Sequence, residues 1–274
     1  MIKPYLFIIT VVFILSSQHF SAFGHSFESD DSVYLLTLIE KTQTELELAN
    51  KNYPSNVTLS MDHSDDAARL VYETFYADED VANDGEFTKR YNQELSKANI
   101  TSNALVVVTL VDEVLRNYVD SIDLNFDLTN MSNLLYIIPT KSTKNITNNE
   151  SIDKLESSFF VDALNNLKNS NLDSINGKNP LFVSNHTIMN YAKHETAKTI
   201  AMKINTLFQL YLKSFIGMDK TKLNDVSKLE DDFYKLYSMI NKNSSPAEIM
   251  KKVHIDIQPT MQKVYNLKIK MQQT

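Results

Sequence analysis

One stretch, His186–Gly217, constrains the fold most, because its periodicity predicts a single helix of about thirty residues. Read at 3.6 residues per turn, its apolar side chains fall on one wide stripe, made of Ala197, Ile200, Ala201, Ile204, Leu207, Phe208, Tyr211 and Phe215. Gly217 predicts the C-terminal cap, because glycine adopts positive φ without steric cost. A stripe of this width needs partner helices to cover it. The stretch therefore predicts a bundle of several helices.

The same periodicity predicts further helices along the chain, at 31–51, at 60–76, after Gly85, from about Thr101, at 151–169 and at 223–241. The helix from Thr101 is apolar on most of its circumference, so we expect it at the centre of the bundle. The helix over 31–51 predicts a buried stripe of Leu35, Ile39, Thr42, Leu46 and Ala49. The helix over 60–76 predicts Ala67, Leu70, Val71 and Phe75 inward. For the helix over 223–241 we predict a buried stripe of Val226, Leu229, Phe233, Leu236 and Ile240.

A strong start signal, Ser245-Pro246-Ala247-Glu248, predicts the last helix of the chain. Serine at the cap, proline at the first helical position and glutamate three residues after the cap are typical of a helix N-terminus. The apolar stripe that follows is Ile249, Val253, Ile257, Met261 and Val264. Pro259 predicts a kink, because proline removes one donor and clashes with the preceding turn.

The scarcity of glycine and cysteine excludes several classes of protein. Only four glycines occur, so the phosphate-binding loops, dinucleotide-binding turns and nucleophile elbows that need glycines at fixed offsets are missing. The chain has no cysteine, which excludes a disulfide scaffold, an iron–sulfur protein and a thiol enzyme. We predict an all-α fold, a bundle of about seven to nine helices in one domain over 25–274, with an Asn/Ser/Thr-rich surface insertion at about 124–150.

The first residues predict a signal peptide over 1–24. Lys3 precedes an apolar run over 5–15, and Ala22-Phe23-Gly24 has the small-x-small pattern that signal peptidase cleaves. The run is short for a bilayer, although a retained N-terminal anchor stays an alternative. Loss of Lys3 would change the net charge from −7 to −8, and this acidity argues against nucleic acid as a partner. We therefore expect an extracytoplasmic protein, secreted or associated with the cell envelope, without a transmembrane span after cleavage.

Asparagine-linked glycosylation motifs are a second, weaker sign of export. They occur at seven positions, Asn56, Asn99, Asn130, Asn145, Asn149, Asn185 and Asn243. Asparagine is so common in this chain that roughly four would arise by chance, so the excess is mild. The motifs are compatible with a glycosylated surface.

Five blocks of sequence carry a resemblance to a known family. They are GHSFESDDSVYLLTLIEKTQTELELANKN, LSMDHSDDAARL, LVDEVLRNY, YAKHETAKTIAMKINTLF and SSPAEIMKKVHIDIQPTMQKVYNL, in this order. Together they resemble an uncharacterised family of exported helical proteins of ammonia-oxidising archaea (Thaumarchaeota). The segment 124–149 falls outside the resemblance. The resemblance implies an exported archaeal protein without an assigned activity, and it favours metal handling because those organisms use copper enzymes outside the membrane.

Histidines supply the candidate metal ligands. His25 would become the mature N-terminus, where an α-amine and an imidazole together chelate copper. His63 at a helix start and His254 on the last helix are the most plausible additional nitrogen ligands. The sequence thus predicts a copper site of His25, His63 and His254. The alternative is that His25 belongs to a tail and that the other two are ordinary histidines at the boundary of the core.

Two familiar metal motifs are excluded. His194-Glu195 begins like a zinc-protease motif, but Lys198 stands where the second histidine is required. A di-iron bundle needs glutamate three residues before histidine, and this spacing is missing from the chain. Adjacent acidic residues such as Glu230-Asp231-Asp232 diverge around a helix and are expected to be solvated.

The sequence predicts a non-enzymatic envelope protein that binds a partner or a ligand, with copper as a candidate. A neighbouring envelope protein is the partner we expect if an exposed apolar patch is present. The alternative is a metal-dependent redox or hydrolytic enzyme whose metal is held by the three histidines. These two hypotheses differ in whether the imidazoles meet at one point.

Overall fold

The computed structural model describes residues 31–76, 99–122, 182–216 and 221–268. The regular structure of these residues is helical, which confirms the all-α prediction for this part of the chain. The described helices form six continuous rods. They are α2 (Asp31–Asn52), α3 (Val57–Tyr76), α5 (Ile100–Ser121), α8 (Tyr191–Leu207) continued by η3 (Phe208–Leu212) and α9 (Lys213–Ile216), α10 (Leu223–Asn241), and α11 (Pro246–Lys251) continued by η4 (Lys252–Ile257) and α12 (Gln258–Tyr265). The helices predicted after Gly85 and over 151–169 lie outside the described residues, as does the insertion at 124–150, so the total of seven to nine stays a prediction.

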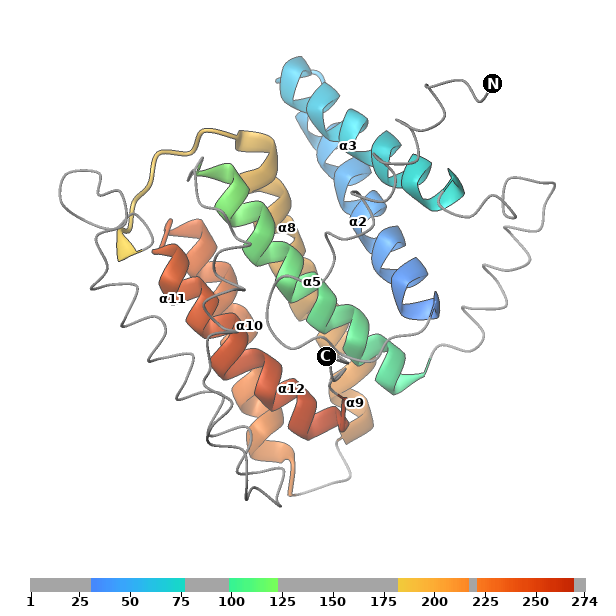
Figure 1. Ribbon diagram of the computed structural model, residues 1–274, viewed down its shortest axis with the longest axis vertical. Coiled ribbons are helices and arrows are strands. Elements are labelled where there is room, and N and C mark those ends of the chain that lie inside the picture. The colour runs from blue at the N-terminus through green and yellow to red at the C-terminus, as the bar shows by residue number, and fades with distance from the viewer. Residues whose placement is uncertain (1–30, 77–98, 123–181, 217–220, 269–274) are drawn as a thin grey trace, which may run out of the picture.

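Helix α5 runs through the centre of the bundle, with α8 alongside it, the α10–α12 helices on one side and the α2–α3 hairpin on the other (Figure 1). Asn99 caps its start, since the side-chain oxygen accepts hydrogen bonds from the backbone N–H groups of Thr101 and Ser102 at 2.8 and 3.0 Å. Val111 and Val114 are fully buried, as expected for the most apolar helix. None of the described helices combines the length and apolarity needed to cross a membrane.

Helices α10 and α11–α12 follow their predicted stripes. All five predicted positions of α10 are buried, and so are all five of the last helix. The capping box is confirmed, because the Ser245 hydroxyl accepts from the Glu248 N–H while the Glu248 carboxylate accepts from the Ser245 N–H. The π-helical segment η4 ends at Ile257, two residues before Pro259. A wider turn accommodates the hydrogen bond that proline cannot donate.

The α2 prediction was right about the helix and only partly right about its buried face, because Ala49 is buried and Leu35, Ile39 and Thr42 are half-buried. Leu46, predicted inward, is 54% exposed, whereas Leu48 is 2% exposed. Five polar residues of α2 are also buried, namely Ser32, Thr37, Thr44, Glu45 and Asn52. On α3, Ala67 and Leu70 are buried as predicted and Val71 is exposed. Part of the α2 face was missed because Glu45 and Asn52 are buried through hydrogen bonds to α3 and α8, which apolar periodicity does not detect.

The long helix begins later than predicted and changes its turn near the end. Residues 186–190 are not helical, and the Asn190 side chain caps α8 by accepting from the Lys193 N–H at 3.0 Å. Tyr211, predicted inside, is 50% exposed, while Leu212 is fully buried. Both residues belong to the π-helical segment η3, which has more residues per turn than an α-helix. The buried residues here are therefore four apart, at Ile204, Phe208 and Leu212. The predicted cap Gly217 lies outside the described residues.

Four of the glycosylation-motif asparagines fall in the described residues, and each has a backbone role. Asn56 accepts a hydrogen bond from the Leu59 N–H near the start of α3, and Asn99 caps α5. Asn185 and Asn243 adopt positive φ, which asparagine tolerates better than most residues. Local backbone geometry therefore explains asparagine at these positions.

Candidate functional site

A cavity of about 320 Å³ lies between α2, α5 and the junction of α8 with η3. Its lining is mainly aliphatic and consists of Leu36, Ile39, Glu40, Gln43, Asn103, Val106, Val107, Leu207, Tyr211 and Leu212. This volume is at the lower end of the range of small-molecule pockets. The cavity is the candidate functional site that the described residues support best.

The lining is ordered by depth. Val106, Val107 and Leu212 are buried and form the floor. Gln43 and Tyr211 are exposed, so they stand at the rim. An apolar floor below a polar rim is typical of a pocket that takes up the hydrocarbon part of a ligand and leaves its polar end near water.

The π-helical segment η3 creates one wall of this cavity. Its wider turn points Leu212 into the core and leaves Tyr211 at the surface, so the floor and the rim are set by neighbouring residues. Turns of this kind inside α-helices recur at functional sites. Apolar periodicity does not reveal the π turn, and for this reason the cavity was not predicted.

Glu40 is the one carboxylate in the lining, and Lys203 of α8 binds it. Lys203 Nζ lies 2.9 Å from Glu40 Oε2 and 3.9 Å from a carboxylate oxygen of Glu47. Two carboxylates therefore share one ammonium group at the side of the cavity. The lining itself contains no lysine, arginine or histidine.

A second feature, a buried polar cluster around His63, joins three helices. His63 of α3 is fully buried, with Nδ1 2.7 Å from Glu45 Oε2 of α2 and Nε2 3.4 Å from Glu195 Oε2 of α8. Thr196 donates to the other Glu45 oxygen at 2.9 Å, and Asn52 donates to Glu195 Oε2 at 2.7 Å. The cluster thereby links the α2–α3 hairpin to α8.

The charge state of His63 follows from these contacts. Burial alone lowers the pKa of an imidazole, because the charged form loses its hydration. The hydrogen bonds and charges of Glu45 and Glu195 outweigh that effect and raise the pKa of His63 above its ordinary value of 6.5. Protonated His63 can donate from both ring nitrogens, so it serves as the bridge between the two carboxylates.

His254 belongs to a different set of contacts. Its Nδ1 lies 2.8 Å from Gln258 Oε1, and Gln258 donates from Nε2 to Asp112 Oδ1 of α5 at 2.8 Å. Loss of hydration, followed by the charge of Glu113, raises the pKa of Asp112 well above its ordinary value. This chain of hydrogen bonds fastens η4 and α12 to the central helix.

The predicted copper ligands are therefore only partly described. His25 lies outside the described residues, and His63 binds Glu45 and Glu195 whereas His254 Nδ1 lies against Gln258. Among the residues that the structure describes, no group of three or more histidine, aspartate or glutamate side chains is arranged to hold a metal ion. The copper site of His25, His63 and His254 stays a prediction.

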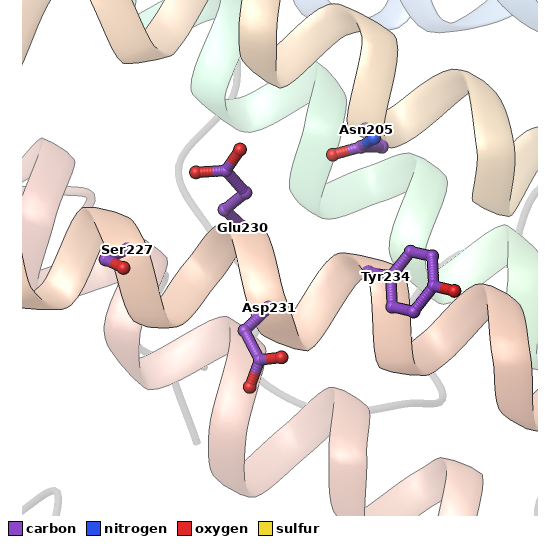
Figure 2. Close-up of a pocket in the computed structure, with 5 residues that line it drawn as sticks. All are labelled: Asn205, Ser227, Glu230, Asp231 and Tyr234. Atoms are coloured by element: carbon purple, nitrogen blue, oxygen red, sulfur yellow. The ribbon is translucent and has the colours of Figure 1, made fainter.

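A second hollow, of about 390 Å³, is lined by polar residues of α8 and α10 (Figure 2). Figure 2 shows the carboxylates of Glu230 and Asp231 pointing in different directions, as expected for neighbours on a helix. Glu230 is bound by Lys213 at 2.8 Å and by Gln209 at 2.8 Å, and these hydrogen bonds lower its pKa. Asp231 is bound by Lys235. These acidic groups are solvated ion pairs and do not converge on a ligand.

Comparison of the chain with protein-family models, with curated proteins and with solved structures gives no match.

Proposed function

We propose that the chain is a non-enzymatic ligand-binding protein of the cell envelope, and that the cavity between α2, α5 and η3 is its binding site. The observation that carries the proposal is the order of the lining, from the buried floor of Val107 and Leu212 to the exposed rim of Gln43 and Tyr211. A pocket of this form binds by excluding water from an apolar group.

Location in the envelope is part of the proposal. It is supported by the apolar run over 5–15 and by the cleavage pattern at Ala22-Phe23-Gly24. The resemblance to exported archaeal proteins agrees with it. Expression of the full chain with N-terminal sequencing of the exported product tests it, and a product that begins at His25 is expected.

Ligand entry can be followed with a single tryptophan, because the natural chain contains none. Leu36→Trp puts an indole at the half-buried wall of the cavity, and Leu46→Trp puts one on the exposed side of the same helix. We expect titration with octanol to shift the emission of L36W in a saturable manner and to leave that of L46W unchanged.

The proposal fails if both variants respond alike, because the response would then be non-specific partition onto the protein. It also fails if none of octylammonium, octanol and octanoate binds the natural chain saturably in calorimetric titration. Circular dichroism of each variant shows whether the helices are intact.

Copper binding remains a candidate extension of this function, and a metal-dependent redox or hydrolytic enzyme remains the alternative. At His63 a metal would have to replace a ring proton of the imidazolium that bridges Glu45 and Glu195, so binding there would compete with an existing ion pair. Mass spectrometry of metal content, on protein exported to its native N-terminus and incubated with copper, tests both. One tightly held copper per chain that His25→Ala removes would favour the copper hypothesis, and its absence would exclude it.

A further inference from the structure

The chemistry of the cavity rim indicates which class of ligand fits. The polar groups of the lining are the Glu40 carboxylate, the carboxamides of Gln43 and Asn103, and the Tyr211 hydroxyl. All four can accept hydrogen bonds, and none carries a positive charge. We propose that the cavity binds a small cationic amphiphile, an alkylammonium compound whose tail lies on the apolar floor and whose head lies at Glu40. This inference rests on the proposed binding function.

The local charge favours a cation even though Glu40 already has a partner. Lys203 is shared between Glu40 at 2.9 Å and Glu47 at 3.9 Å, so these three side chains together carry one net negative charge. Glu40 is half-buried, whereas Glu47 is 65% exposed at its side chain and is therefore better screened by water. The Lys203 ammonium lies nearer to Glu40, yet it cannot neutralise both carboxylates, so a net negative charge remains beside the cavity.

The size of the cavity limits the hydrocarbon part. A cavity of about 150 Å³ holds benzene, so one of about 320 Å³ accommodates on the order of a dozen non-hydrogen atoms. A straight chain of about eight carbons with one head group meets this limit. Long-chain lipids with two tails exceed it.

An anionic amphiphile is the main competitor. A carboxylate head placed at the rim would face Glu40 at short range, and like charges repel. It could be accommodated only if Lys203 left Glu40 and turned to the ligand. A cationic ligand therefore leaves the ion pair between Glu40 and Lys203 intact, whereas an anionic ligand requires it to break.

Calorimetric titration of the full natural chain with octylammonium, octanol and octanoate separates these possibilities, because the three share one tail. We expect octylammonium to bind about fivefold more tightly than octanol, since a half-exposed carboxylate contributes less than a fully buried one. Octanoate should bind most weakly. Glu40→Gln should abolish the preference for octylammonium over octanol, while Glu47→Gln, at the other carboxylate of Lys203, should preserve the order.

Each outcome has one meaning. Equal affinities for the three amphiphiles, or tightest binding of octanoate, overturn the cationic preference and leave the binding function intact. No saturable binding of any of them to the natural chain overturns the binding function itself. If Glu40→Gln fails to fold, the order measured on the natural chain still decides the preference.

Discussion

The two sides of the central helix are held by different kinds of contact. On one side, α10 and α11–α12 pack through continuous apolar stripes, such as Leu229, Phe233 and Leu236, all of them fully buried. On the other side, the α2–α3 hairpin meets α8 through the buried cluster of Glu45 and His63. The first side is stabilised mainly by removal of apolar area from water, and the second depends in addition on satisfied charges.

The two sides should respond differently to mutation and to pH. Apolar contacts lose stability in proportion to the volume removed and depend little on pH. A buried charge pair loses stability when one partner is removed, and it responds to pH through the pKa values of its members. The hairpin should therefore be the side whose contacts depend most on solution conditions.

The largest effect is expected from Phe233→Ala on the apolar side. Phe233 is fully buried, and its ring packs edge-to-face on Phe208 with centroids 5.2 Å apart. Removing it should lower the free energy of unfolding by roughly 3–5 kcal/mol, measured by urea denaturation. The neighbouring Tyr234→Ala, at an exposed position, is the control and should change stability by less than about 0.5 kcal/mol. Similar losses in both variants would contradict the assigned core.

A somewhat smaller effect is expected from His63→Leu on the polar side. It leaves Glu45 buried with Thr196 as its remaining described donor, and the expected loss is about 3 kcal/mol. The double variant Glu45→Leu/His63→Leu replaces the pair by apolar groups and should be more stable than His63→Leu alone by at least about 1 kcal/mol. If the double variant instead loses the sum of the two single losses, the residues act independently and the comparison between the two sides fails.

The smallest effect is the dependence of the hairpin on pH. The pKa of His63 is raised in the fold, so its contribution is fully present below 6.5 and is lost as the pH rises through the folded value. The pKa values of Asp66 and Glu195 are lowered, although burial by itself would raise them, because Lys193 binds Asp66 and Asn52 binds Glu195. Their contributions are present above 3.8 and 4.5 respectively, and they are lost in acid.

The hairpin should therefore be most stable between pH 4.5 and 6.5 and loosen on either side. Hydrogen exchange of α3 amides across this range is the measurement. The alkaline loss should disappear in His63→Leu and persist in Met61→Leu, an exposed site two residues away. An alkaline loss of equal size in His63→Leu would assign the effect to another group.

Sequence alone was sufficient where apolar side chains decide the packing. The stripe of α10 and the capping box at Ser245 and Glu248 are confirmed in detail, because burial and local hydrogen bonding are both encoded within one helix. The central position of α5 follows for the same reason. These predictions needed no knowledge of the neighbouring helices.

The sequence was insufficient where a residue's place depends on a distant partner. Glu45 is buried because His63 and Thr196 bind it, and neither contact has a signature in the spacing of α2. Tyr211 lies at the surface and Leu212 in the core because η3 has a wider turn than the assumed α-helix. The cavity depends on that turn, so the candidate site could not be predicted before the structure was known.

The π turn at Phe208–Leu212 also has a consequence for changes in chain length. A turn closed from residue i to i+5 contains one residue more than the α-helical turn it replaces. Deletion of one residue there, such as Leu210, would leave an ordinary helix in which the residues before and after keep their sides toward the bundle. Such a shortened chain would remain a bundle but would lose the wall that Leu212 and Tyr211 form. Small insertions and deletions at this place are thus a route by which the fold can acquire or lose its cavity without rebuilding its core.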